Sequence, residues 1–329
     1  MGTANTVAAG SRGRQAADAR SFAARLRNGD EIAHLITLVF AASVCLIVCL
    51  LVIQLFIHSS ASRHQFGWTF FVSRTWDPVF DNFGALPFIY GTIVTSVLSL
   101  LFAVPLGVGG AIFLAEFAPP RLSDSLTFIV ELLAAVPSVI FGLLGIFVVV
   151  PVMRTTVDPI LQKFFGYLPL FSGPIYGLGF LTAGIVLAIM IVPYILSVSR
   201  EVLLAVPADQ REAALGLGAT RWESIWQVVV PYAKTGILGS IFLALARALG
   251  ETMAVTMVIG NDPKISSSLF APGYTIAAVI ANEFSEATGK LYLHSLIELG
   301  LVLFIITVIL NGLARLLILA TSQGGSVRG

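Results

Sequence analysis

Charged residues are scarce in this sequence, and their scarcity excludes most soluble proteins. Asp, Glu, Lys and Arg make up 11% of the 329 residues, whereas apolar residues make up 57%. A typical soluble domain carries about 25% charged residues. The apolar residues come in blocks that approach or exceed the roughly 20 residues that a helix needs to cross a bilayer. The sequence therefore predicts an all-α integral membrane protein surrounded by lipid, and its net charge of +1 gives no indication of a nucleic-acid partner.

Residues that bind metals, hold nucleotides or attack substrates are also few. The only cysteines, Cys45 and Cys49, are four residues apart in an apolar run, which provides too few ligands for a metal site. No H-E-x-x-H pattern occurs, and the phosphate-binding pattern G-x-x-x-x-G-K-[ST] is absent because Leu291 follows Gly289 and Lys290. No nucleophile lies in a pattern with a base. We therefore expect no metal, no cofactor, no catalytic residue and no phosphate-cradling ATP loop of this type.

Six apolar blocks predict six transmembrane helices. The blocks are 35–57, a part of 86–117, 126–150, 175–198, 235–259 and 292–319. Residues 1–30 lack apolar periodicity and predict a disordered cytoplasmic tail. We expect the first helix and an external loop in 31–85, a helical core in 86–319 and a second cytoplasmic tail in 320–329. The segment 151–174 contains four prolines among aromatic residues and predicts an interfacial or re-entrant segment.

The distribution of basic residues predicts the orientation of the helices. With the N-terminus inside, the tails and inner loops hold twelve Lys and Arg residues, and the outer loops hold six. Cytoplasmic loops of membrane proteins carry an excess of basic residues. The bias predicts that both termini lie in the cytoplasm, together with the polar segment 200–234.

The segment 200–234 contains the signals of two short helices joined at glycine. Pro207 suits the first turn of a helix, and Gly218 lies where that helix can end. Thr220 and Glu223 form a capping-box pattern for a second helix, which we expect to end at Pro231. The second helix would place Trp222, Ile225, Trp226 and Val229 on one face, which is not the basic face that a DNA-reading helix needs. We call the segment 200–234 the elbow.

One basic residue lies outside the tails and loops. Arg247 falls near the middle of the fifth predicted span, and Glu251 follows four residues later on the same helical face. A single charge at this depth costs about 3 kcal/mol or more, and a pair costs less. Two interpretations stay open: an ion pair that fixes helix packing, or a lining for the route of a polar or anionic solute. Glu131 and Glu298 are further carboxylates within predicted spans, and we expect them to form hydrogen bonds between helices.

The elbow resembles the EAA loop of bacterial ABC-importer permeases. Glu212, Ala213 and Ala214 are followed by Gly218 and, at the end of an apolar run, by Pro231. Val228 and Val230 stand where the family usually has Ile and Leu. The resemblance implies a type I ABC-importer permease core in 86–319. It also implies that Glu212, Ala213, Ala214, Gly218 and Pro231 belong to coupling helices that dock on a separate ATPase.

The segments 131–145 and 244–261 narrow the resemblance to the PstC family of phosphate-importer permeases. This family resemblance implies a bacterial plasma-membrane protein that works with a PstA-like second permease, a dimer of a PstB-like ATPase and an external PstS-like phosphate-binding protein. It places Arg247 and Glu251 on the translocation pathway. An importer for another anion and an ion-coupled secondary carrier that relays protons through Glu251 or Glu298 remain alternatives, although a secondary carrier does not explain the elbow.

Overall fold

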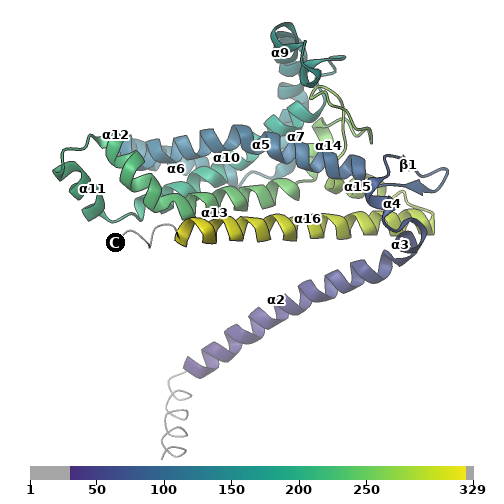
Figure 1. The fold of residues 1–329 in the computed structure, drawn as a ribbon, viewed down its shortest axis with the longest axis horizontal. Coiled ribbons are helices and arrows are strands. Elements are labelled where there is room, and N and C mark those ends of the chain that lie inside the picture. The colour runs from purple at the N-terminus through teal and green to yellow at the C-terminus, as the bar shows by residue number, and fades with distance from the viewer. Residues whose placement is uncertain (1–29, 324–329) are drawn as a thin grey trace, which may run out of the picture. The chain divides into compact units, whose positions relative to one another are not determined.

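The computed structural model describes residues 30–323, which form two units. The first unit ends at Ile57, and its described part is the apolar helix α2, Asp30–His58, without the last residue of that helix. The second unit begins at His58 and contains all other elements (Figure 1). Most of the two predicted tails, residues 1–29 and 324–329, lies outside the described residues. The last helix, α16 (Lys290–Gln323), continues four residues beyond the expected core boundary at 319.

The second unit is helical apart from one short hairpin. The hairpin pairs β1 (Trp76–Asp77) with β2 (Asn82–Phe83) in antiparallel register. Its helices in chain order are α3 (Ser60–Phe66), α4 (Thr69–Val72), α5 (Leu86–Ile112), α6 (Pro120–Ala134), α7 (Ser138–Leu144), α8 (Val150–Val152), α9 (Asp158–Phe165), α10 (Phe180–Leu204), α11 (Ala208–Gly216), α12 (Arg221–Ser224), α13 (Val230–Leu249), α14 (Met253–Val258), α15 (Ile276–Glu283) and α16. Four π-helical turns interrupt or extend them: η1 (Phe113–Phe117), η2 (Gly145–Val149), η3 (Met153–Val157) and η5 (Ile225–Val229).

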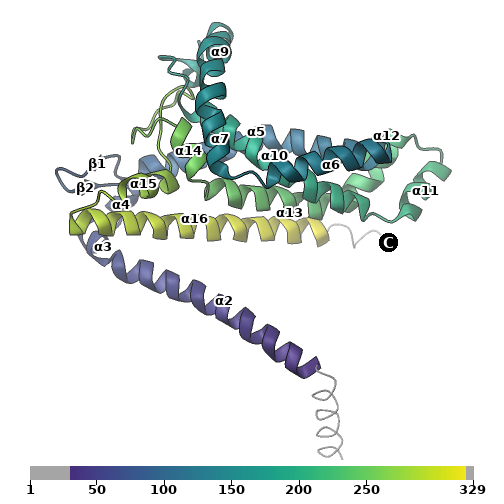
Figure 2. The ribbon, with the colours of Figure 1, turned by 180° about the vertical axis from the view of Figure 1, so that it is seen from behind.

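Four long helices, α5, α10, α13 and α16, run along the length of this unit (Figures 1 and 2). Small residues let α5 and α10 approach closely, as is common where membrane helices pack against each other. A Cβ atom added to Gly107 would lie 2.8 Å from Ile195, and one added to Gly184 would lie 2.7 Å from Leu98. Large apolar side chains such as Leu101 and Leu106 are 63% and 64% exposed on the outer surface of α5. A surface of this kind suits contact with lipid tails.

The described residues contain six helices that are long and apolar enough to cross a membrane. They are Ile32–His58, Leu86–Phe117, Ser138–Phe165, Phe180–Leu204, Arg221–Leu249 and Lys290–Leu319. The predicted number of spans is confirmed, but the expected bounds of the third span were wrong. The chain leaves the helical conformation at Ala135–Pro137, because a residue before proline is disfavoured in a helix. A new helix begins at Ser138 and includes most of the segment that we expected to be interfacial or re-entrant.

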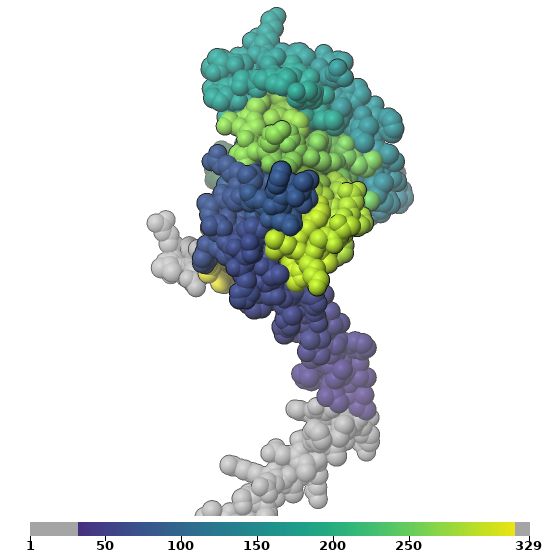
Figure 3. Space-filling model, turned by 90° about the vertical axis from the view of Figure 1, so that its right-hand side faces the viewer, coloured from purple at the N-terminus to yellow at the C-terminus, as the bar shows by residue number. Residues whose placement is uncertain are grey.

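The end of this unit opposite α11 is built from loops that come together from distant parts of the sequence. Leu269 N–H donates to the Leu170 carbonyl at 2.8 Å, and the Tyr90 hydroxyl donates to the Ser266 carbonyl at 2.7 Å. In Figure 3 the light green segment of residues 260–285 accordingly lies between the teal and the blue parts of the chain. Burial raises the pKa of Tyr274 in this region to about 12, so its hydroxyl stays protonated and accepts a hydrogen bond from Asn282 at 3.0 Å.

Candidate functional site

The elbow contains the two short helices, joined at glycine, that its sequence predicts, and α11 is the first of them. Helix α10 continues to Leu204, beyond residue 200 where the elbow was expected to begin. Pro207 occupies the N-cap of α11. On α11, Glu212 and Ala213 are exposed, whereas Ala214 is buried. The two residues that are accessible to a partner are thus held on a helix whose neighbouring alanine packs inward.

Glycine and a capping box form the joint between α11 and α12. Gly218 has a φ of +91°, in the left-handed region that glycine adopts without strain. Glu223 N–H donates to Thr220 Oγ1 at 3.3 Å, and Thr220 N–H donates to Glu223 Oε2 at 2.8 Å. Both hydrogen bonds of the predicted capping box are therefore present. They fix the start of α12 directly after the glycine.

The expectation that Pro231 ends this second helix was wrong. The helix continues from α12 through the π turn η5 into α13, and Pro231 lies in the first turn of α13. A proline within an α-helix collides with the carbonyl four residues earlier, and a π turn directly before it widens the helix at that point. The elbow is thus continuous with the fifth span. The expected single apolar face also divides, because Ile225 and Val229 are buried, whereas Trp222 and Trp226 are exposed.

Arg247 and Glu251 do not lie on one face of a continuous helix as we expected, and the ion pair, one of the two interpretations left open, does not form. Helix α13 ends at Leu249, and α14 begins at Met253, so the two residues lie on either side of a break in the helix. Glu251 Oε1 accepts a hydrogen bond from Ala254 N–H at 3.2 Å, in the first turn of α14. Within the described residues, no salt bridge within 4.0 Å joins the two side chains.

The break at Gly250 has a tertiary cause as well as a local one. Glycine disfavours the interior of a helix by about 1 kcal/mol relative to alanine. Helix α14 packs closely on α7, where a side chain at Gly142 would collide with Met257 and lie 3.2 Å from Ala254. This packing sets the direction of α14 independently of α13, which no pattern within 244–261 indicates.

Arg247 stacks on an aromatic ring that sequence reasoning missed. Its guanidinium carbon lies 4.3 Å from the centre of the Tyr194 ring in α10, which is within the range of a cation–π contact. The Tyr194 hydroxyl donates to the Ala134 carbonyl at 2.9 Å, at the end of α6. Arg247 Nε is buried and has no hydrogen-bond partner among the described residues. The residue is therefore oriented by stacking, and part of its hydrogen-bonding capacity is unused.

The two other carboxylates within predicted spans do not form the interhelical hydrogen bonds that we expected. Glu131 is exposed on α6. Glu298 is 1% exposed on α16 near Ser62 and Arg63, but neither of its oxygen atoms has a hydrogen-bond partner among the described residues. Ser295 instead makes the polar contact with this region, donating to Ser62 Oγ at 3.1 Å.

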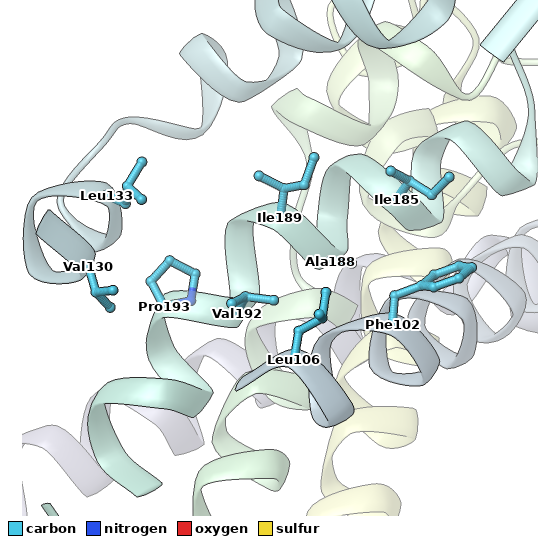
Figure 4. Close-up of a pocket in the computed structure, with 9 residues that line it drawn as sticks. All are labelled: Phe102, Leu106, Val130, Leu133, Ile185, Ala188, Ile189, Val192 and Pro193. Carbon is cyan, nitrogen blue, oxygen red and sulfur yellow. The ribbon is translucent and has the colours of Figure 1, made fainter. Parts of the chain in front are cut away.

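A cavity beside Tyr194 is lined by apolar side chains alone. It has a volume of about 490 Å³ and lies between α5, α6 and α10 (Figure 4). Its lining consists of Phe102, Leu106, Val130, Leu133, Ile185, Ala188, Ile189, Val192 and Pro193. An anion has no hydrogen-bond donor there, and burying it without one is costly. Within residues 30–323, no group of three or more His, Cys, Asp or Glu side chains is placed to hold a metal ion.

Comparison with known proteins identifies the family. Residues 107–322 match the family described as binding-protein-dependent transport system inner membrane component. The chain belongs to this family. It is 48% identical over 294 residues to the phosphate transport system permease protein PstC of Mesorhizobium japonicum, covering 88% of this chain and 90% of the relative. It is 50% identical over 261 residues to the PstC of Xylella fastidiosa, covering 78% and 80%. A probable PstC of Methanocaldococcus jannaschii is 36% identical, covering 87% and 92%.

Solved ABC transporters share the fold of this family member. A bacterial alginate ABC transporter in complex with a pentasaccharide-bound periplasmic protein aligns with a TM-score of 0.54 at 17% identity, covering 84% of this chain and 92% of that one. An inward-facing methionine transporter, MetNI, aligns with a TM-score of 0.53 at 15% identity, covering 75% and 99%. The arrangement of the long helices is therefore that of ABC-importer permeases.

Proposed function

We propose that this chain is a permease subunit of an ATP-driven phosphate importer in a bacterial plasma membrane. It forms part of the pathway for inorganic phosphate and performs no covalent chemistry. Phosphate as the solute is supported by the printed names of relatives that are 48% to 50% identical over most of their length. An importer for a different anion is the nearest alternative.

The observation that carries the proposal is an exposed docking surface on a chain whose sequence has no phosphate-binding ATP loop. We define the elbow face as the exposed residues Glu212, Leu217, Gly218, Trp222 and Trp226. Leu217 is 91% exposed, Trp222 is 57% exposed and Trp226 is 47% exposed. Large apolar side chains gathered at a polar turn mark a protein interaction site. We infer that a separate ATPase dimer, PstB-like, binds this face, with both termini of the chain on the same side.

The structure gives the elbow a mechanical connection to the middle of the bundle. Because Pro231 does not end the helix, residues from Arg221 to Leu249 form one continuous rod that reaches Arg247. Movement of the elbow face by an ATPase would therefore move Arg247. In this proposal Arg247 attracts the phosphate anion, and Glu251 lies on the opposite side of the helix break.

In the proposed assembly the chain also contacts a second permease, an external binding protein and lipid. A PstA-like permease would complete the pathway as a heterodimer, a PstS-like external protein would deliver phosphate at the end opposite the elbow, and lipid would surround the apolar outer surface. A cavity of about 360 Å³ at that opposite end is lined by residues from two loops, including serines such as Ser172 and Ser266 and several prolines. It is a candidate contact region for the delivering protein.

Uptake in vesicles tests the proposal. The complex is reconstituted with its partners, and entry of radiolabelled phosphate is measured with and without ATP and with a proton uncoupler. We expect uptake that requires ATP and the ATPase and that resists the uncoupler. Uptake that survives removal of the ATPase but is abolished by the uncoupler would show a secondary carrier instead.

A further inference from the structure

Arg211, the residue before Glu212 in the elbow, donates hydrogen bonds to one carboxylate and to two backbone carbonyls. Its Nε and Nη2 donate to Glu116 Oε1 at 3.2 and 2.9 Å. Its Nη1 donates to the Val206 carbonyl at 2.6 Å, and its Nη2 also donates to the Leu203 carbonyl at 2.7 Å. The side chains of Arg211 and Glu116 are only 23% and 11% exposed. A partly desolvated, charge-assisted contact of this kind is stronger than an exposed ion pair.

These acceptors lie at the ends of two membrane helices and in the connection that follows one of them. Glu116 lies in η1, the π turn that extends α5, Leu203 lies in the last turn of α10, and Val206 lies in the short connection between α10 and α11. Carbonyls at the end of a helix have room for a side-chain donor, and Arg211 donates to Leu203 there and to Val206 beyond it. One guanidinium group therefore joins α11 to the ends of α5 and α10. These two helices pack closely along their length, as Gly107 and Gly184 show.

The glycine joint is the reason that the Arg211 contact matters for the transmission of movement from α11. The chain connects α11 to α13 only through the linker at Gly218, and the Cβ position of Gly218 faces open space. Glycine allows large changes of backbone angle at little cost. A displacement of α11 can thus be absorbed at Gly218 instead of being transmitted along the chain. The contacts of Arg211 do not pass through that joint.

We propose that Arg211 is the positioning residue that transmits movement of the elbow to α5, an element that the chain does not connect directly to α11, whereas α10 and α13 are joined to α11 covalently. The inference rests on the proposed function, because it assumes that an ATPase moves the elbow face. A planar guanidinium reaches the carboxylate and both carbonyls at once, whereas an ammonium group is a single point donor on a flexible stem. The arrangement therefore requires arginine and not only positive charge.

The test compares coupling, measured as phosphate transported per ATP hydrolysed, in reconstituted complexes of the full chain. We expect Arg211→Met to lower this ratio at least tenfold, and Arg211→Lys and Glu116→Gln to lower it at least threefold, with the ATPase still copurifying. Glu201→Gln is the matched control, since Glu201 pairs with Arg200 on the same helix and its side chain is 69% exposed. This control is expected to keep the normal ratio.

A normal ratio in both Arg211→Lys and Glu116→Gln would overturn the proposal. If Arg211→Met does not assemble, Glu116→Gln decides the question, because it keeps the size of the side chain and leaves the carbonyl contacts in place. If the unmodified complex transports no phosphate with ATP, the proposed function fails instead, so the two failures are distinguishable.

A cross-link distinguishes transmission of movement from a contribution to stability. Cys45→Ser and Cys49→Ser remove the two native thiols, and Glu116→Cys with Arg211→Cys introduces a new pair. Joining this pair with a short bismaleimide replaces the ionic contact by a covalent one. We expect the ratio, lowered in the unlinked double variant, to recover at least threefold after linking. No recovery would show that the contact does not transmit the movement.

Discussion

Arg211 and Arg247 differ in how far other groups of the protein use their hydrogen-bond donors. Arg211, in the elbow, donates to the carboxylate of Glu116 and to two backbone carbonyls at and just beyond the end of α10. Arg247, in the last turn of α13 and not in the middle of the span as the sequence predicted, stacks on Tyr194, and its Nε has no partner among the residues described. One guanidinium is occupied by the protein, and the other retains donors for a ligand. In the proposed function, Arg211 fixes the frame that transmits movement, whereas Arg247 is available to the solute.

The largest expected effect comes from removing the charge of Arg247. We predict that Arg247→Gln lowers phosphate uptake about 100-fold, because two charge-assisted hydrogen bonds to an anion contribute roughly 3 kcal/mol. Uptake of radiolabelled phosphate into vesicles measures the effect, and copurification of the partners shows that the complex is assembled. Arg247→Lys is the matched variant and should lose less. Normal uptake by Arg247→Gln would assign the residue to packing.

The same substitution at the two arginines should affect stability differently. We predict that Arg211→Met destabilises the chain by about 3 kcal/mol, because it leaves a partly buried carboxylate and two carbonyls without their partner. Arg247→Met should cost less, since only the stacking contact is lost. The midpoint of thermal unfolding in detergent measures both variants. Equal shifts for the two would remove the distinction between an occupied and an available arginine.

Tyr194 tests whether stacking orients Arg247. A cation–π contact contributes about 0.5 to 2 kcal/mol, so Tyr194→Leu should lower uptake by roughly 2- to 30-fold. Tyr194→Phe keeps the ring and loses only the hydrogen bond to the Ala134 carbonyl, and we expect it to stay within about twofold of the native rate. A larger loss for Phe than for Leu would mean that the contact with α6, and not the ring, matters.

The smallest expected effect is that of alanine substitutions around the glycine joint. Gly218→Ala forces a side chain into the left-handed region at a cost of about 1 to 2 kcal/mol, whereas Gly216→Ala, at the end of α11, should be neutral or stabilising. The yield of copurified ATPase measures the consequence for docking. Gly218→Arg adds a bulky charge to the elbow face and should prevent copurification altogether. A normal yield with Gly218→Arg would place the docking surface elsewhere.

Local signals allowed part of the elbow to be predicted. Glycine in the joint and the Thr220 and Glu223 capping box are found where the sequence indicates, Pro207 lies one position before the first turn, and the expected end at Pro231 was wrong. The six spans follow from hydrophobic length alone. The family also followed from sequence, since the EAA pattern combines fixed spacing with a fixed place in the chain.

Long-range packing determined what the sequence did not reveal. The break between Arg247 and Glu251 depends on α14 packing against α7. The contact between Arg211 and Glu116 joins residues 95 positions apart. Tyr194 lies in an apolar run, where no local pattern marks an aromatic residue as the partner of a charged side chain. A single sequence contains no signal for these pairings.

Chemical protection of the two arginines tests the central claim most directly. The reconstituted complex is treated with phenylglyoxal, which modifies arginine, at increasing concentrations of phosphate, and modification of each residue is followed by mass spectrometry. The account predicts that Arg247 reacts without phosphate and is progressively protected by it, whereas Arg211 reacts slowly at every concentration. Modification of Arg247 at the same rate with and without phosphate would contradict its assignment to the pathway.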